Sequence, residues 1–266
     1  MYESYWGLSE KPFENTPNPK FFFTSAQHEE GLTRLLYGIR ERKGAVMLTG
    51  VFGCGKTLLA NTLFSELEKD LYQTAFIVNP RMEPLDLLRY LTHELGGKTM
   101  PEKKAECMVL LKSVLMNNYQ DGKESVIVID EAHTIEDEHV FEEIRLLLNF
   151  QLPDRFLATI LLLGQPELTP MVKASKQLDQ RIAIRYHLEA LNSEEAKGYV
   201  KHRLGVAGRK EPIFKEEALK LLHSRSGGIP RRINQIADMA LFVGFSQKKR
   251  LIDRAGVEEA IRSLEG

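Results

Sequence analysis

The stretch GVFGCGKT at residues 50–57 decides the fold, because it fits the pattern G-x-x-x-x-G-K-[ST] at every fixed position. A short apolar run at residues 45–49 precedes it and is typical of a buried strand. Residues 58–67 follow it with apolar side chains at helical spacing. A strand, a glycine-rich loop and a helix in this order surround a polyphosphate with backbone N–H groups and a helix N-terminus. The sequence therefore predicts a loop that binds the phosphates of a nucleotide.

This motif assigns roles to residues of the loop and of the helix start. Lys56 is predicted to reach the β- and γ-phosphates, and the Thr57 hydroxyl is predicted to ligate Mg²⁺. A glycine-rich turn could match the pattern by chance, but the preceding strand and the following helix argue against this alternative. The residues predicted to bind the nucleotide are Gly50, Gly53, Cys54, Gly55, Lys56, Thr57 and Leu58.

A second motif, VIVIDE at residues 126–131, is an apolar strand that ends in two carboxylates. Asp130 is predicted to hold Mg²⁺, directly or through water, and Glu131 to orient the water that attacks the γ-phosphate. Two acidic residues after a strand often only begin a loop. In a chain that also has a phosphate-binding loop, they predict Mg²⁺-dependent nucleotide hydrolysis, with Glu131 and Lys56 as catalytic residues.

The order of elements predicts an α/β fold. Apolar runs of strand length alternate with helical patterns up to about residue 190, which indicates a parallel sheet covered on both faces. From Asn192 onward the pattern contains helices only. We therefore predict a P-loop NTPase core with a parallel sheet, followed by a small all-helical lid domain. The expected strands are residues 45–49, 73–79, 125–129, 156–163 and 184–188.

Three segments follow from this organisation. Residues 1–24 are rich in aromatic residues and proline, too apolar for a disordered tail and too interrupted for a helix. We expect them to form an extended segment packed on the core. Residues 25–190 are expected to form the nucleotide-binding core, and residues 191–266 the helical lid.

The composition does not identify a binding partner, but it does indicate the cellular compartment. The 266 residues include 36 basic and 37 acidic side chains, a balance that argues neither for nor against nucleic acid. Two cysteines are too few for a disulfide framework, and the N-terminus does not resemble a signal peptide. No apolar run approaches the ~20 residues of a membrane helix. We therefore expect a cytoplasmic protein without a membrane span.

Taken together, the motifs make the chain resemble the AAA+ ATPases. The order is a phosphate-binding loop, a D-E pair, a polar residue at a strand end, an arginine before the last strand, and a helical domain with G-x-P-R. More narrowly, the chain is similar to the ExeA/GspA-type ATPases, the secretion-associated AAA proteins, over essentially its whole length. The stretches that carry this resemblance are YWGL at 5–8, KPF at 11–13, TPNP at 16–19, YGI at 37–39, GQPEL at 164–168, QRI at 180–182, RYHL at 185–188 and GGIPRR at 227–232.

The resemblance implies further site residues. Gln165 matches the sensor 1 residue, which contacts the γ-phosphate or the attacking water, and Arg231 matches sensor 2, which reaches from the lid to the phosphates. Arg181 matches the arginine finger that acts on the nucleotide of a neighbouring subunit, with Arg185 as the alternative. Asn79 matches the residue that can hold the catalytic glutamate away from the water until a partner binds.

These assignments compete with structural alternatives. An arginine before a strand commonly forms surface ion pairs, and Gln165 and Asn79, each followed by a proline, are typical of turns. His28 could border the adenine, but we interpret it as a helix-surface residue. His133 completes the D-E-A-H signature of a helicase class that needs two RecA-like domains, which 266 residues cannot hold. We therefore expect His133 to be structural.

The shared active site implied by the resemblance predicts a homo-oligomer, either a ring or a filament. The client is not identified by the sequence. One hypothesis is a switch or motor for a secretion or envelope assembly, and the other is a DNA-binding ATPase of the transposition target-selection type. From Lys197 to Arg254 the chain has 14 Lys and Arg against 5 Asp and Glu. This surface could follow a DNA backbone or be the solvated face of the lid, and we favour the second interpretation.

Overall fold

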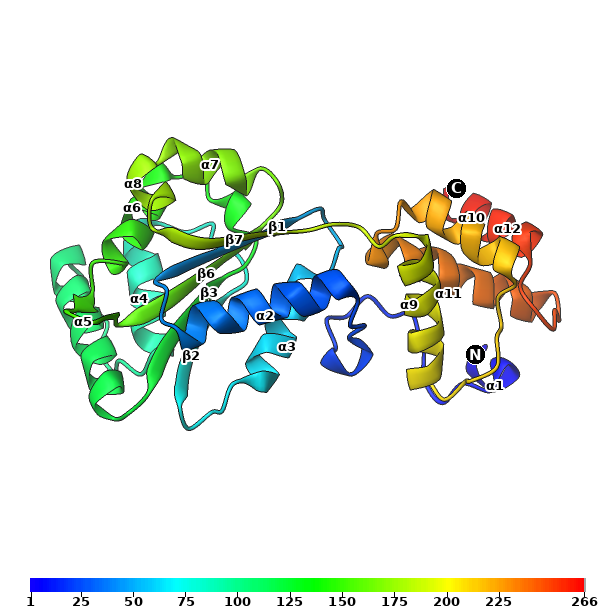
Figure 1. Cartoon of the computed structure of the whole chain (residues 1–266), viewed down its shortest axis with the longest axis horizontal. Coiled ribbons are helices and arrows are strands. Elements are labelled where there is room, and N and C mark those ends of the chain that lie inside the picture. Colours follow the sequence, from blue (N-terminus) through cyan, green and yellow to red (C-terminus); the bar gives the residue numbers. More distant parts are fainter. Residues whose placement is uncertain (266) are drawn as a thin grey trace. The chain divides into compact units, whose positions relative to one another are not determined.

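The computed structural model describes residues 1–265, which form two compact units (Figure 1). The sheet unit contains residues 29–50 and 59–188. The helical unit contains residues 1–28, residues 51–58 and the chain from Glu189 onward. Each unit has a buried apolar core of its own.

A five-stranded parallel sheet forms the centre of the sheet unit. Its strand order is β2-β3-β6-β1-β7, so β1 lies between two strands that come much later in the chain. Strands β1 and β6 are buried along their whole length, as expected for a parallel sheet covered on both faces. All five strands expected from the sequence are present. They are β1 (Ala45–Gly50), β2 (Tyr72–Ile77), β3 (Glu124–Ile129), β6 (Ala158–Gly164) and β7 (Ile182–Leu188).

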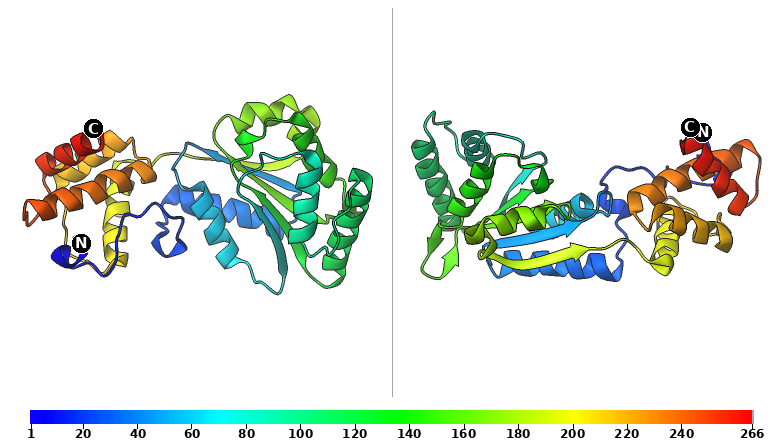
Figure 2. Two further views of the ribbon diagram at one scale, coloured as in Figure 1. Left: turned by 180° about the vertical axis from the view of Figure 1, so that it is seen from behind. Right: turned by 90° about the horizontal axis from the view of Figure 1, so that it is seen from above.

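Alternate strand residues face opposite layers of helices, which lie on either side of the sheet in Figure 2. Met47, Ile127 and Ile160 belong to a core that the sheet shares with helices α4 to α8. On the other face Val46 packs against α2, where any side chain at Gly38 would overlap the valine. The helices are α2 (Ala26–Arg40), α3 (Lys56–Glu66), α4 (Pro84–Glu94), α5 (Lys104–Gln120), α6 (Glu138–Leu147), α7 (Leu168–Ala174) and α8 (Lys176–Asp179), with a 3₁₀ turn η2 (Ala132–Thr134) after β3.

Some elements of the sheet unit have no counterpart among the expected ones. An antiparallel hairpin joins β4 (Gln151–Leu152) to β5 (Arg155–Phe156), and the short helices α7 and α8 precede β7. Two-residue strands and helices of seven and four residues are too short to produce a periodic hydrophobic pattern. Periodicity therefore could not reveal them.

Four helices after Glu189 make up most of the helical unit. The first begins at a capping box, in which the Asn192 side chain accepts two backbone N–H groups and the Glu195 carboxylate accepts the N–H of Asn192. Pro230 opens the third helix at a position where its missing N–H costs nothing. Neither these helices nor any other among the described residues is long and apolar enough to cross a membrane. They are α9 (Ser193–Val206), α10 (Glu216–Ser226), α11 (Pro230–Ser246) and α12 (Arg254–Glu265).

The N-terminal segment belongs to the helical unit, whereas we expected it to pack on the nucleotide-binding core. The side chains of Tyr2, Trp6 and Phe13 are buried among the helices of this unit, and the Trp6 indole Nε1 donates to the carbonyl of Leu241 at 2.9 Å. The difference arises because these large rings complete the core of the small helical unit. The segment is also not fully extended, since it contains α1 (Glu3–Trp6) and the 3₁₀ turn η1 (Pro19–Phe21).

Candidate functional site

The loop at residues 51–55 joins β1 to α3 and is shaped by two glycines. Gly53 has a φ of 84° and Gly55 a φ of 107°, values that glycine adopts without strain. Because α3 begins at Lys56, the loop leads directly into a helix N-terminus, the arrangement that binds phosphate. Lys56 is 4% exposed, and its Nζ donates to the carbonyl of Val51 at 3.2 Å. The backbone therefore has the form of an anion-binding cradle.

His28, near the start of α2, contacts this loop within the helical unit. Its Nε2 lies 3.1 Å from the carbonyl oxygen of Cys54, and its Nδ1 lies 2.7 Å from Ser25 Oγ. Burial lowers the pKa of His28, so a neutral ring donates through Nε2 and accepts the Ser25 hydroxyl proton. The interpretation of His28 as a helix-surface residue is wrong, since only 6% of it is exposed. It supports the phosphate-binding loop instead.

Arg231, at the start of α11, contacts the same loop. Its backbone N–H donates to the carbonyl of Gly53 at 3.2 Å, and its guanidinium carbon lies 4.4 Å from the centroid of the Phe52 ring. A Cβ atom at Gly53 would lie 2.7 Å from Cβ of Arg231, so this approach requires glycine. The structure thus brings the loop and Arg231 together.

In the sheet unit, predicted site residues lie at the carboxyl ends of three neighbouring strands. Asn79 comes shortly after β2, Gln165 directly after β6, and the carboxylates of Asp130 and Glu131 directly after β3. Asp130 is 1% exposed. Parallel strands bring their carboxyl ends to one edge of the sheet, which is where open α/β sheets bind ligands. Gly50, which leads into the phosphate-binding loop, ends β1 at the same edge.

Glu131 and Gln165 meet at one imidazole ring. The carboxylate of Glu131 lies 3.4 Å from Nε2 of His133. Nδ1 of His133 accepts the backbone N–H of Gln165 at 3.2 Å, and Nε2 lies 2.9 Å from the amide nitrogen of the Gln165 side chain. The predicted catalytic glutamate and the predicted sensor residue therefore share a neighbour.

The backbone at Glu131 is held firmly at the start of the turn η2. Its φ of 52° lies in the left-handed region, which is uncommon outside glycine. The Glu131 N–H donates to Oδ1 of Asp130 at 2.9 Å, and its carbonyl accepts both the N–H and the hydroxyl of Thr134 at 2.8 Å. The turn fixes the Cα position of Glu131 and leaves its side chain to be positioned by neighbours.

Asn79 is not part of this cluster. Its side chain is exposed, and its Oδ1 accepts the backbone N–H of Arg81 at 3.3 Å, which closes a turn. Within residues 1–265 no hydrogen bond joins Asn79 to Glu131. Asn79 thus forms the turn that was considered as an alternative from the sequence. Its role in holding Glu131 stays a prediction.

Both candidates for the arginine finger have partners in their own chain. Arg181 donates to the carbonyl of Leu148 and to Oδ1 of Asn149, each at 3.0 Å, at the carboxyl end of α6. Arg185 donates to the carboxylate of Asp179 at 2.8 Å and lies on β7, an edge strand of the sheet. For each of them, action on a neighbouring subunit stays a prediction.

Two residues, Thr57 and Asp130, are predicted to hold Mg²⁺. Within the part of the chain that the structure describes, no group of three or more His, Cys, Asp or Glu side chains could hold a metal. Proteins usually hold Mg²⁺ with one or two ligands together with substrate phosphates and water, and the role of Thr57 and Asp130 stays a prediction. The left-handed glycines and the N-terminus of α3 supply the phosphate cradle on which such a site depends.

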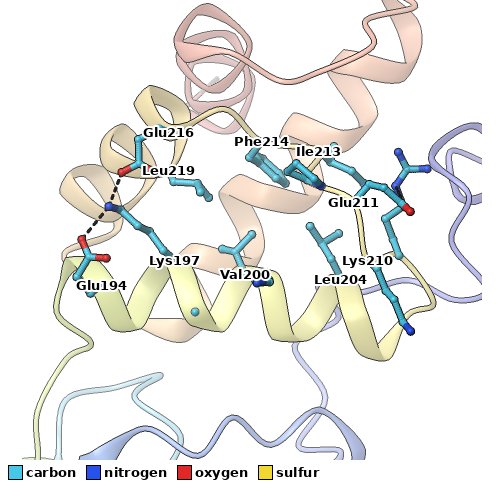
Figure 3. A pocket seen from close by; sticks show the side chains of 14 residues that line it. Glu194, Lys197, Val200, Leu204, Lys210, Glu211, Ile213, Phe214, Glu216 and Leu219 are labelled. Atoms are coloured by element: carbon cyan, nitrogen blue, oxygen red, sulfur yellow. Dashed lines mark hydrogen bonds and ion pairs between the residues drawn. The ribbon is translucent and has the colours of Figure 1, made fainter.

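A pocket of about 410 Å³ lies on the helical unit beside α9 (Figure 3). Leu204 and Phe214 contribute apolar lining, and at one end Lys197 forms ion pairs with Glu194 and Glu216. Its lining includes none of the site residues predicted from the sequence. We therefore do not assign it to nucleotide binding.

Sequence reasoning missed three contacts of the candidate site. His133 carried a signal, the D-E-A-H spelling, which we attributed to a structural role. Phe52 was read only as a variable position of the loop, because the pattern there specifies no residue type. His28 lies 26 residues before Cys54, and nothing in the sequence joins the two.

Comparison with known proteins agrees with this geometry. A family model described as "AAA domain" matches residues 39–172. General secretion pathway protein A of Aeromonas hydrophila is 39% identical over 273 aligned residues, which cover 100% of this chain and 49% of that protein. The chain therefore spans about half the length of this curated relative.

Solved structures share the fold at low sequence identity. The ORC2 protein of Aeropyrum pernix matches with a TM-score of 0.68 and 17% identity, over 92% of this chain and 71% of that one. The RuvB Holliday junction branch migration motor of Thermotoga maritima matches with a TM-score of 0.62 and 18% identity, over 91% and 70%. Likeness at such identities shows the fold alone. The fold class predicted from the sequence is confirmed.

Proposed function

Because the chain belongs to the AAA domain family, we propose that it binds ATP with Mg²⁺ at residues 50–58 and hydrolyses it. The observation that carries the proposal is the loop with left-handed Gly53 and Gly55, followed at once by the N-terminus of α3. Backbone N–H groups in such a loop converge on a polyphosphate.

Each proposed site residue has a distinct task. Lys56 binds the β- and γ-phosphates, while Thr57 and Asp130 hold Mg²⁺, which neutralises charge on the phosphate oxygens. Glu131 orients the attacking water, and Arg231 approaches the phosphates from the start of α11. Gln165 contacts the terminal phosphate or that water.

We further propose that the protein acts as a homo-oligomer in the cytoplasm, with residues from about 191 onward as a lid. Arg181 or Arg185 would complete the site of a neighbouring subunit, because guanidinium groups stabilise the charge that develops during phosphoryl transfer. The cycle would drive a switch or motor for a partner assembly. The likeness to General secretion pathway protein A favours a secretion or envelope client.

The test is the rate of ATP hydrolysis measured against protein concentration for three proteins. The unchanged chain should hydrolyse ATP in the presence of Mg²⁺, with a specific activity that rises with concentration. Lys56→Ala should lose ATP binding. Glu131→Gln should bind ATP, but its turnover should be reduced roughly 100-fold or more, because the variant lacks the carboxylate that acts on the water. Wild-type turnover in Glu131→Gln would refute the assignment of the catalytic carboxylate.

A second candidate function is binding of double-stranded DNA, favoured by the turn between α11 and α12. Lys248 and Arg250 are exposed there, and Leu251 is 41% exposed. The Tyr5 hydroxyl donates to the carbonyl of Lys249 at 2.8 Å, which brings a half-exposed aromatic ring to the same turn. Exposed basic side chains attract the phosphate backbone of double-stranded DNA.

Fluorescence anisotropy with labelled duplex DNA at two salt concentrations tests this second candidate. A DNA-binding protein should lose affinity as salt rises, and the double variant Lys248→Glu with Arg250→Glu should weaken binding further. Equal anisotropy with and without the protein at low salt would exclude DNA as the partner of this turn. ATP hydrolysis that rises with protein concentration would then point to a protein client.

A further inference from the structure

We propose that His133 is a positioning residue that couples the Gln165 side chain to the carboxylate of Glu131. This role rests on the proposed function, since it concerns the water-activating glutamate of the same site. The observation is the single imidazole that lies 3.4 Å from the Glu131 carboxylate and 2.9 Å from the Gln165 amide. His133 thereby gains a task that the D-E-A-H spelling alone did not reveal.

The hydrogen-bond inventory of the ring determines what it can do. Nδ1 accepts the backbone N–H of Gln165, so in a neutral imidazole the proton resides on Nε2. That one N–H faces two acceptors. One is the Glu131 carboxylate, and the other is the side-chain oxygen of Gln165 once the amide group has rotated to exchange its nitrogen and oxygen. The two acceptors compete for one donor.

This competition links the two site residues. When the side-chain oxygen of Gln165 accepts the N–H of Nε2, the ring has no N–H left to donate to the Glu131 carboxylate. When Gln165 turns toward a terminal phosphate or water, Nε2–H is left to orient Glu131. Contact of Gln165 with nucleotide therefore places Glu131 for its work on the water.

The surroundings of His133 restrict movement to these side chains. Its side chain is 13% exposed, so the donor is largely shielded from solvent that would otherwise replace either acceptor. A Cβ atom at Gly164 would lie 3.3 Å from the backbone nitrogen of His133, so the end of β6 packs tightly against the turn. The backbone of Glu131 is held by its contacts with Asp130 and Thr134.

The coupling differs from the arrangement that the family resemblance implies. Asn79 is the residue expected to hold the glutamate, yet its Oδ1 is bonded to the backbone N–H of Arg81. His133 is the side chain that lies beside the Glu131 carboxylate. In this chain the Glu131 side chain is therefore positioned by His133, in the turn η2 that follows it.

The experiment measures kcat, KM and equilibrium ATP binding for His133→Phe and His133→Gln beside the unchanged protein. Phenylalanine keeps a planar ring without the donor, and glutamine restores an N–H donor. His133→Phe should lower kcat roughly 10- to 100-fold with KM and ATP affinity nearly unchanged, because a misplaced group costs rate rather than binding. His133→Gln should recover part of the loss.

A double variant distinguishes coupling between Gln165 and Glu131 from a general loss of structure at the site. Gln165→Ala removes the competing acceptor and leaves Nε2–H to the Glu131 carboxylate, so adding His133→Phe should lower kcat at least as much as it does in the unchanged protein. A double variant no slower than Gln165→Ala would overturn the coupling. So would wild-type kcat in His133→Phe, or a failure of His133→Gln to recover activity when its thermal unfolding midpoint matches that of the unchanged protein.

The outcomes distinguish this inference from the proposed function. If the unchanged protein and Lys56→Ala show the same absence of ATP binding, the proposed function fails, and the coupling fails with it. If the unchanged protein hydrolyses ATP, Glu131→Gln does not, and His133→Phe behaves as wild type, the function stands and the role of His133 alone is refuted.

Discussion

The helical unit and the sheet unit hold their predicted site residues by different means. In the helical unit the contacts run to the backbone of the phosphate-binding loop: His28 to the Cys54 carbonyl and the Arg231 N–H to the Gly53 carbonyl. In the sheet unit, Glu131 and Gln165 are joined through a side chain, the His133 ring. The first region therefore depends on backbone shape and the second on side-chain identity.

The largest effect on the loop should come from Gly53→Ala. An alanine at a φ of 84° carries about 1–2 kcal/mol of strain, and its Cβ would crowd Cβ of Arg231 at 2.7 Å. Because the loop must relax away from its native shape, we expect ATP affinity to fall about tenfold or more. Titration of a fluorescent ATP analogue measures this change.

Gly96→Ala is the matched control for backbone strain. Gly96 has a φ of 106°, but a Cβ atom there would meet nothing within 4 Å. This variant should lose some stability and keep its ATP affinity. Equal affinities for Gly53→Ala and the unchanged protein would show that backbone shape at Gly53 does not govern binding.

A smaller effect is expected from Phe52→Leu, which keeps an apolar side chain but removes the ring under Arg231. A cation–π contact at an exposed site contributes about 0.5–1 kcal/mol, so ATP affinity should fall roughly two- to fivefold. Phe52→Tyr, which retains a ring, should behave as wild type. In an Arg231→Ala background Phe52→Leu should have no further effect, and an equal loss in both backgrounds would contradict a role through Arg231.

The smallest effect concerns the pH dependence of stability at His28. Burial lowers the pKa of this histidine in the folded protein below the unfolded value of about 6.5. As pH falls below 6.5 the unfolded chain takes up a proton that the folded protein resists, so stability is present above that pH and is lost below it. The thermal unfolding midpoint of the unchanged protein should therefore fall more between pH 7.5 and 5.5 than that of His28→Asn.

His93→Asn is the control, because His93 is an exposed histidine whose ring lies beside the carboxylate of Glu94. It should keep the pH dependence of the unchanged protein. If His28→Asn and His93→Asn follow the same curve, the buried ring does not contribute to the acid sensitivity of the helical unit.

The fold was predictable because its signals are local. The β1 run and the GVFGCGKT loop identify the P-loop core, and the apolar strand before Asp130 identifies a second buried strand. The helices of the C-terminal region were visible because the pattern contains helices only from Asn192 onward. The β4–β5 hairpin and the helices α7 and α8 were invisible because short elements leave no hydrophobic period.

The site contacts were less predictable because they depend on tertiary placement. Motif spacing marks Lys56 and Glu131, yet it cannot show that His28 bonds to Cys54 or that Arg231 rests on Phe52. Asn79 illustrates the same limit. The sequence shows a polar residue before a proline, and only the structure shows that its side-chain oxygen accepts the Arg81 N–H.

The aromatic residues of the N-terminal segment, which are buried in the helical unit, affect how the chain folds during translation. Trp6 is synthesised more than two hundred residues before Leu241, which accepts its indole N–H. At about 5–20 residues per second this delay is on the order of ten to fifty seconds. During that interval Tyr2, Trp6 and Phe13 lack the helices that later cover them, while the whole of the sheet unit emerges and can fold. During this interval the N-terminal segment therefore presents an apolar surface to ribosome-associated chaperones.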